Sequence, residues 1–231
     1  MNALLLSAGE GTRLRPLTLE MPKCLLPLIN DEPILKYWID ILIEIGIEAI
    51  FINIYWLKDK IVRYIDNLDE DIRDKIYLYR ENYLEPVGEV LSKLKFIIGS
   101  PIIIINSDTY IEKDEIRKFI QMAKITPDFV ICLGIEKRES VRGKGLVRFD
   151  EVGRVTDFME KPDKDEPGYS YAGIMLLDTS IITNGMVKKE LTQDILPDFK
   201  NKMTAIKIGN VIDIGDSLET YYQACERFTK K

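Results

Sequence analysis

The chain has 231 residues, which is enough for one sizeable domain that buries a core without disulfides or metal ions to hold it together. Its composition, 46% hydrophobic and 30% charged, is typical of a soluble globular protein, and its net charge of −6 argues against a nucleic-acid-binding surface. The absence of histidine excludes His-based catalysis and His-ligated metals, so a metal ion would need carboxylate ligands, which favour Mg²⁺ or a similar hard cation.

Short apolar segments alternate with amphipathic ones along the chain. The apolar segments predict strands at Ala3–Leu6, Ala49–Ile54, Lys75–Tyr79, Pro101–Ile105, Phe129–Leu133, Gly145–Phe149, Val155–Met159, Gly173–Leu177 and Thr204–Ile208. Helical spacing of apolar residues, together with proline and glycine stop signals, predicts helices at Pro33–Ile45, Leu57–Leu68, Val87–Leu94, Asp114–Ala123 and Ser217–Phe228.

The order of these elements predicts the fold class. Up to Leu133 strands and helices alternate, which favours an α/β fold with a doubly wound, mostly parallel, Rossmann-like sheet. The nearly all-apolar strand Ile102–Ile105 fits such a sheet because it can be buried on both faces. Beyond Leu133 the strands follow one another closely, so we expect a smaller mixed or antiparallel lobe. No linker rich in Gly, Ser or Pro divides the chain, and we expect a single domain over residues 1–231.

The segment after the first expected strand carries the strongest functional pattern. It reads Ala8-Gly9-Glu10-Gly11-Thr12-Arg13-Leu14-Arg15-Pro16-Leu17-Thr18 and is followed by Pro22-Lys23. Gly9 and Gly11 have no Cβ, so their amides can approach a ligand closely, and Thr12 adds a hydroxyl. Arginine and lysine side chains in the same segment supply the cations that a triphosphate needs.

Two common nucleotide-binding motifs do not fit this segment. Leu14 stands where a dinucleotide fingerprint has its third glycine, and Pro16 argues against a helix running straight on from the loop. No Gly-Lys-Ser/Thr follows, which excludes a Walker loop. A dinucleotide-dependent oxidoreductase is therefore disfavoured.

The string from Gly9 to Lys23 resembles the sugar-1-phosphate nucleotidyltransferase family, whose pattern is Gly-x-Gly-Thr-Arg-Leu-x-Pro-Leu-Thr, a few residues, then Pro-Lys. The resemblance extends from Ala3 to about Tyr222, with the motifs in the family's order. It implies condensation of a nucleoside triphosphate with a sugar 1-phosphate, giving a nucleotide-sugar and pyrophosphate. It also implies a Mg²⁺ cofactor.

The candidate metal ligands are aspartates that leave two alternatives open on the residues alone. Asp108 follows the buried strand Ile102–Ile105, where an aspartate serves equally well as a turn residue or helix cap. Asp213 precedes the last helix, although Asp216 and Ser217 are better placed to cap that helix. The resemblance favours metal ligation, because the family holds Mg²⁺ between an aspartate after the central strand and one in an Asp-Ile-Gly segment.

The resemblance assigns the remaining roles residue by residue. It implies catalytic roles for Arg13 and Lys23, and nucleotide binding by Ala8, Gly9, Gly11, Thr12, Gly88 and Asp108. It implies sugar-phosphate binding by Glu160, Lys161, Tyr171 and Gly173. Read without the resemblance, Glu160-Lys161-Pro162 is an ordinary charged turn, and the glycines are ordinary glycines beside strands.

Several departures from the family pattern lie in or beside the segments that select base and sugar, namely Pro86, Val87, Ser107, Lys144 and Tyr171. They leave both identities open, with a weak preference for GTP and a mannose- or heptose-type 1-phosphate, then UTP. One alternative is a cytidylyltransferase acting on a non-sugar phosphate such as phosphocholine. Another is a relative that binds a nucleotide-sugar without turnover.

The remaining expectations concern partners and location. No apolar run approaches the ~20 residues of a membrane span, and no basic leader precedes the first apolar stretch, so we expect no membrane partner. Three scattered cysteines, with neither metal spacing nor a disulfide framework, suit a reducing cytoplasm. We expect no C-terminal β-helix domain. The tyrosines of the last helix suggest a homodimer, although core packing explains them equally well.

Overall fold

The computed structural model describes residues 1–126, 129–160, 162 and 165–229. The chain divides into two compact units. The first comprises Met1–Leu84, Ile105–Tyr110 and Ile212–Lys231, and the second comprises Glu85–Ile104 and Ile111–Val211. Neither unit is a continuous stretch of sequence, and the expectation of one domain over residues 1–231 stays a prediction.

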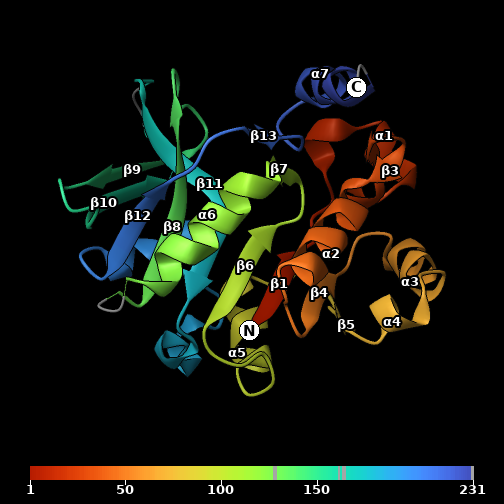
Figure 1. Cartoon of the computed structure of the whole chain (residues 1–231), viewed down its shortest axis with the longest axis horizontal. Coiled ribbons are helices and arrows are strands. Elements are labelled where there is room, and N and C mark those ends of the chain that lie inside the picture. The colour runs from red at the N-terminus through yellow and green to blue at the C-terminus, as the bar shows by residue number, and fades with distance from the viewer. Residues whose placement is uncertain (127–128, 161, 163–164, 230–231) are drawn as a thin grey trace. The chain divides into compact units, whose positions relative to one another are not determined.

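The first unit is built on parallel strands. β1 (Asn2–Leu6) pairs with β4 (Ile50–Ile54), and β4 pairs with β5 (Ile76–Arg80). Figure 1 shows these strands side by side. The connections and flanks contain α1 (Leu17–Glu20), α2 (Ile34–Glu44), α3 (Lys58–Asp66), α4 (Glu70–Arg73), α7 (Leu218–Thr229), the hairpin of β2 (Pro27–Ile29) with β3 (Glu32–Pro33), and 3₁₀ turns at Thr12–Leu14 and Lys23–Leu25.

The core of the first unit is mostly aliphatic, and Trp38 is its largest fully buried side chain. β4 is buried along its whole length, as expected for a strand covered on both faces. Trp38 of α2 is fully buried, and its Nε1–H donates to the carbonyl of Thr109 at 3.0 Å, which ties α2 to the segment after β6. α7 is fastened to β2 through Tyr221, whose hydroxyl donates to the Pro27 carbonyl at 2.7 Å.

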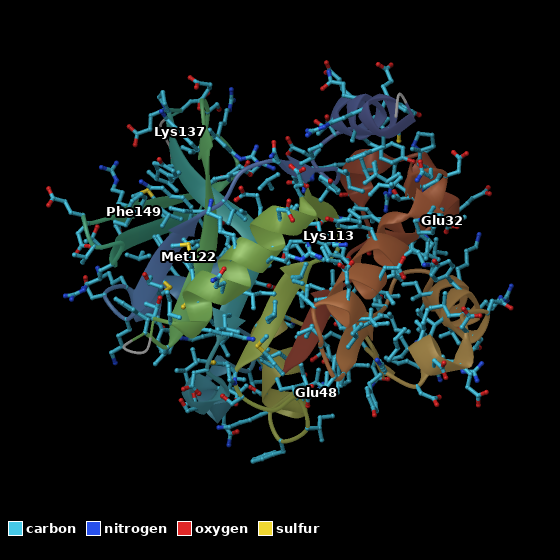
Figure 2. The ribbon with its side chains drawn as sticks, viewed as in Figure 1. Glu32, Glu48, Lys113, Met122, Lys137 and Phe149 are labelled. Carbon is cyan, nitrogen blue, oxygen red and sulfur yellow. The ribbon has the colours of Figure 1, made fainter. Side chains whose placement is uncertain are left out.

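The second unit is a mixed lobe. β10 (Val155–Glu160), β9 (Gly145–Phe149), β11 (Gly168–Leu177) and β8 (Ile131–Arg138) are joined in that order by antiparallel pairing, and β12 (Met203–Lys207) runs parallel to β8. The unit also contains α5 (Val87–Leu94), α6 (Lys113–Lys124), 3₁₀ turns at Thr179–Ile181, Asn184–Met186 and Leu196–Phe199, and a π-helical turn at Leu191–Ile195. Figure 2 marks Lys137 of β8 and Phe149 of β9.

Three short strands lie where the chain passes from one unit to the other. They are β6 (Ile102–Asn106), β7 (Thr109–Ile111) and β13 (Val211–Asp213), and β7 and β13 pair as a two-stranded sheet. β6 is buried from Ile102 to Ile105, as its composition predicts.

The α/β class with a parallel sheet and a mixed lobe is confirmed, and the main differences concern strand length. The expected strand Gly173–Leu177 is the second half of β11, which begins at Gly168. Gly173 has φ +78°, and the register of β11 against β8 shifts between Tyr171 and Met175, so the periodicity breaks inside the strand. β8 likewise runs on to Arg138, through charged residues that pair across to β11. Among the described residues, no helix has both the length and the apolar character that a membrane span requires.

Candidate active site

The loop of residues Ser7–Thr12, here called the glycine loop, follows β1 in the first unit. Gly11 has φ +65°, and a Cβ there would lie 2.9 Å from Cγ2 of Thr18, so both the backbone conformation and the packing require glycine. Thr18 is fully buried and donates its hydroxyl to the Gly11 carbonyl at 2.7 Å. A Cβ at Gly9 would meet no heavy atom within 4 Å. Packing against Thr18 therefore fixes the loop at Gly11, whereas Gly9 faces empty space.

Trp56 anchors the glycine loop from the exit of β4, a role that the sequence does not reveal. Its backbone N–H donates to the Ala8 carbonyl at 3.3 Å, and its indole N–H donates to the Thr18 carbonyl at 2.8 Å. The loop is thus held both at its start and at the threonine that supports Gly11. Backbone amides fixed in this way are suited to bind an anion without further rearrangement.

Lys23 and Asp108 form an ion pair beside the loop, with side-chain exposures of only 19% and 14%. Burial by itself would raise the pKa of Asp108. The Lys23 charge and its hydrogen bond outweigh burial and hold the pKa of Asp108 below its ordinary value. Asp108 is therefore ionised at neutral pH. The structure brings these two predicted site residues into direct contact.

Gly215 closes this site from the segment before α7. A Cβ at Gly215 would lie 2.2 Å from Oδ2 of Asp108 and 2.9 Å from Nζ of Lys23, so the ion pair lies directly against its backbone. The segment Asp213-Ile214-Gly215 stands out in the sequence. The sequence does not show, however, that Gly215 leaves space for the Asp108 carboxylate and the Lys23 ammonium.

Asp213 ends β13 next to the backbone of Asp108. The Ile214 N–H donates to the Asp108 carbonyl at 3.0 Å, and Oδ1 of Asp213 accepts from the Gly215 N–H at 3.0 Å. Two carboxylates from adjoining segments fit Mg²⁺, which prefers oxygen ligands and is commonly held by one or two carboxylates plus substrate phosphates. Among the described residues no group of three or more His, Cys, Asp or Glu side chains could hold a metal ion, so phosphate oxygens would have to complete the coordination.

The arginines of the segment lie at the surface of the first unit. Arg13 Nη1 is 3.1 Å from Oδ1 of Asp216, and Arg15 Nη2 is 3.2 Å from Oε2 of Glu10. All four side chains are at least one-third exposed. Exposed pairs of this kind contribute little stability, so Arg13 can exchange Asp216 for a phosphate at small cost. Of the two residues that the sequence offers as helix caps, Asp216 and Ser217, it is Ser217 that caps α7, accepting from the Thr220 N–H at 3.1 Å.

Gly88 in the second unit packs against the chain's own backbone. A Cβ there would lie 2.2 Å from the Met186 carbonyl oxygen, and the Gly88 N–H donates to the Lys189 carbonyl at 3.0 Å. This contact by itself explains why position 88 is glycine. Nucleotide binding by Gly88 stays a prediction.

Three of the four predicted sugar-phosphate residues lie in the described part of the second unit, Glu160 at the end of β10 and Tyr171 and Gly173 within β11. Glu160 of β10 pairs with Gly145 of β9, and a Cβ at Gly145 would be 3.0 Å from Oε2 of Glu160. β11 pairs with β9 through Tyr169 and Ser170, the two residues directly before Tyr171, and Tyr171 itself pairs with Ile135 of β8. Gly173, two residues after Tyr171, has a left-handed backbone conformation within β11. Lys161 lies outside the described residues.

The hydroxyl of Tyr171 is buried and has no hydrogen-bond partner within the described part of the chain. Burial raises the pKa of this phenol, and no other group opposes that shift. A buried hydroxyl without a partner carries a free-energy penalty of about 1–3 kcal/mol, which a ligand hydroxyl could relieve.

The chain resembles known proteins in both sequence and structure. The family model described as "Nucleotidyl transferase" matches residues 2–216, through both units. The chain is 29% identical over 227 residues to D-glycero-alpha-D-manno-heptose 1-phosphate guanylyltransferase of Campylobacter jejuni, covering 96% of this chain and 97% of that protein. It is 27% identical over 181 residues to the bifunctional protein GlmU of Methanocaldococcus jannaschii, covering 78% of this chain and 41% of that protein. The chain spans about half the length of several curated relatives.

A solved structure resembles the whole chain. The crystal structure of HddC from Yersinia pseudotuberculosis complexed with GMP-PN has a TM-score of 0.80 and 28% sequence identity, and the match covers 98% of this chain and 99% of that one. The family model extends over most of the sequence, including the glycine loop, Lys23, Asp108 and Asp213. The chain therefore belongs to the nucleotidyl transferase family.

Proposed function

We propose that this protein transfers a nucleotidyl group from a nucleoside triphosphate to a sugar 1-phosphate and releases pyrophosphate. The observation that carries the proposal is the Lys23–Asp108 pair, which lies against Gly215 in the same unit as the glycine loop. A cation and a carboxylate that are partly withdrawn from water, near a loop of fixed amides, suit a reaction between two polyanions. The first unit would bind the triphosphate, and the second unit the sugar phosphate.

The chemistry needs no general base. A phosphate oxygen of the sugar 1-phosphate, already anionic at neutral pH, attacks the α-phosphorus in line with the departing pyrophosphate. The obstacle is charge repulsion, because two unit charges at 4 Å repel by about 4 kcal/mol at an effective dielectric of 20. Positioning and charge neutralisation therefore dominate the rate.

Each residue of the first unit has a role in this proposal. The backbone amides of Gly9, Gly11 and Thr12 cradle the triphosphate, with Ala8 at the start of the cradle. Arg13 leaves Asp216 to bind the departing pyrophosphate. Lys23 bridges the α-phosphate and the incoming phosphate, which requires it to share or leave its contact with Asp108.

The carboxylates of Asp108 and Asp213 would hold Mg²⁺, which when bound neutralises phosphate charge and polarises the α-phosphoryl oxygen. The Asp108 carboxylate would be shared between such an ion and Lys23, and Lys23 would provide its charge to the substrate phosphates.

In the second unit, Glu160 would accept hydrogen bonds from sugar hydroxyls, and the hydroxyl of Tyr171 would gain the partner that the protein does not provide. Gly145 and Gly173 would leave space for the ring, and Lys161 would bind the sugar phosphate. GTP with a mannose- or heptose-type 1-phosphate is our preferred substrate pair. The heptose 1-phosphate guanylyltransferase and the GMP-PN complex among the relatives support this preference.

The test is pyrophosphate release measured over a matrix of nucleotides and phosphates with Mg²⁺. GTP, UTP, CTP and dTTP are each paired with mannose 1-phosphate, a heptose 1-phosphate, glucose 1-phosphate and phosphocholine. We expect turnover with a sugar 1-phosphate, and most with GTP. Turnover with CTP and phosphocholine alone would instead support the cytidylyltransferase alternative. Nucleotide-sugar binding without pyrophosphate release in any pair would support a non-catalytic relative.

A further inference from the structure

Two polar side chains, those of Asn53 and Glu81, are buried next to the start of the glycine loop. Asn53 is 3% exposed and interrupts the aliphatic strand Ile50–Ile54, and Glu81, directly after β5, is 0% exposed. Burying an amide or a carboxylate is unfavourable unless hydrogen bonds compensate. An apolar pair of similar volume would serve stability at least as well, so these residues point to a role beyond packing.

The side-chain amide of Asn53 donates a hydrogen bond to one neighbour and accepts one from another. Its Nδ2 donates to Oε1 of Glu81 at 2.7 Å, and its Oδ1 accepts from the backbone N–H of Ser7 at 2.8 Å. Oε1 of Glu81 accepts from Nδ2, so the amide nitrogen of Asn53 faces Glu81. The carbonyl oxygen is thereby directed at Ser7. Glu81 is held in turn by its own backbone N–H, which donates to the Ile54 carbonyl at 3.0 Å.

This chain of contacts ends at the first residue of the glycine loop. Leu6 and Asn53 are paired in the β1–β4 ladder, so the side chain of Asn53 binds the amide at which β1 ends. The carbonyl of the next residue, Ala8, accepts a hydrogen bond from the backbone N–H of Trp56, which lies just after β4. Ser7 and Ala8 therefore set the direction in which the chain enters Gly9.

We propose that Asn53 and Glu81 are positioning residues for the glycine loop: Glu81 orients the amide of Asn53, and Asn53 fixes Ser7, so that the loop amides point at the triphosphate. The proposal rests on the proposed function of the loop. Neither residue contacts substrate, since Glu81 is wholly buried and Asn53 nearly so. Their effect on the reaction is through the backbone at Ser7.

The test exchanges the amide group at position 53 and the carboxyl group at position 81. N53D places two carboxylates face to face and removes the donor, whereas the double variant N53D/E81Q restores both bonds, because the carboxylate at position 53 then accepts from Ser7 and from the new amide at position 81. Measurements are made across a range of pH, because a proton shared between the two buried carboxyl groups of N53D would partly restore the lost bond at lower pH. We expect N53D to lower kcat/KM for the triphosphate by about 10²-fold, the scale of a misplaced reacting group, and the double variant to recover most of it. The KM for the sugar phosphate should change little.

The control is N67D, the same substitution at an exposed asparagine of the first unit, whose side chain donates to the Arg63 carbonyl at 2.8 Å. It should leave kcat/KM unchanged. A double variant no more active than N53D, although folded, would overturn the proposal. If N53D does not fold, N53D/E81Q is compared directly with wild type and E81Q, and failure of the double variant to match wild type overturns it.

A second readout separates this proposal from the proposed function. The exchange rate of the Ser7 amide, followed by NMR, should rise in N53D and return to the wild-type value in N53D/E81Q. If the wild-type protein releases no pyrophosphate with any substrate pair, the proposed function fails, and the exchange measurement still tests the contact. Unchanged Ser7 exchange in N53D would overturn the positioning role.

Discussion

Lys23 and Arg13 carry the positive charge of the proposed reaction, but their surroundings differ. Lys23 is largely buried and paired with Asp108, whereas Arg13 is more than half exposed beside Asp216. Removing a partner from a buried pair costs about 3–5 kcal/mol, and removing one from an exposed pair costs about 0–1 kcal/mol. We therefore expect substitution of Lys23 to lower both activity and stability, and substitution of Arg13 to lower activity with little effect on stability.

Lys23→Ala and Arg13→Ala should each lower kcat by about 10²–10³, because each removes a charge that stabilises the transferred phosphates. Only Lys23→Ala should also lower the free energy of unfolding markedly, since it strands the Asp108 carboxylate. Pyrophosphate-release kinetics and urea unfolding measure the two effects. Lys36→Ala, which removes an exposed pair with Asp40, is the control. Near wild-type turnover of either variant would remove that residue from the mechanism.

Gly215→Ala tests the close packing behind the Lys23–Asp108 pair. Its new Cβ would lie 2.2 Å from the Asp108 carboxylate, so the pair must move or the segment before α7 must shift. We expect a loss of about 1–3 kcal/mol in unfolding free energy and a large fall in kcat. Gly209→Ala is the matched control, because a Cβ there meets nothing within 4 Å. Equal behaviour of the two alanine variants would show that the pair does not depend on Gly215.

Tyr171→Phe should change stability and substrate affinity in opposite directions. The variant removes a buried hydroxyl that has no partner among the described residues, so the melting temperature should stay the same or rise. The KM for the sugar 1-phosphate should rise by about 2–10-fold, which corresponds to one hydrogen bond. Tyr77→Phe, at an exposed tyrosine stacked on Phe51, is the control. A lower melting temperature with unchanged KM would contradict a role of this hydroxyl in substrate binding.

Helix α7 shows how a single cap links an element to the site. The Ser217 hydroxyl accepts from the Thr220 N–H at 3.1 Å and lies directly after the segment Asp213–Asp216. It fixes the point at which the chain leaves the candidate metal ligand and becomes helical.

Ser217→Ala should destabilise the protein by about 1 kcal/mol, because the amide of the first helical turn loses its acceptor. Urea unfolding followed by circular dichroism measures this loss. Ser217→Asp should restore it, since aspartate caps equally well and favours a helix N-terminus. If the alanine and aspartate variants unfold alike, the cap does not stabilise α7.

For the molecule as a whole, buried thiols make stability depend on alkaline pH. Burial raises the pKa of Cys24 to about 12 and that of Cys132 to about 11, from an ordinary value of 9.0. The folded chain keeps these protons, whereas the unfolded chain loses them above pH 9. Their contribution to stability is thus complete below pH 9 and is lost as the pH rises toward 11–12.

The free energy of unfolding should therefore decline from pH 9 to pH 10.5, measured by urea titration at several pH values. The variant Cys24→Ala/Cys132→Ala should decline less steeply over the same range, whatever its stability at pH 8. The comparison uses slopes, so cavities left by the removed thiols do not confound it. Identical slopes in the two proteins would assign the alkaline dependence to other groups.

The parts of the fold and site that could be predicted are those with local physical causes. Periodic apolar residues placed most strands and helices within a few residues, since burial of one face requires that spacing. Gly11 could be identified because a tight loop with a left-handed backbone conformation favours a residue without Cβ. The prediction misses the first half of β11 because Gly173 interrupts its pattern, and that half is held by pairing with β8 and β9, which the local sequence does not show.

The sequence by itself determined the α/β class, the glycine loop and the residue types available for the chemistry, with no histidine among them. Only the tertiary structure decided which groups meet. Lys23 reaches Asp108 across 85 positions and Arg13 reaches Asp216 across 203, and Asn53 joins Ser7 to Glu81. Such contacts depend on which strands pair and in what register, and local propensity carries no information about either because the partners are far apart in the chain.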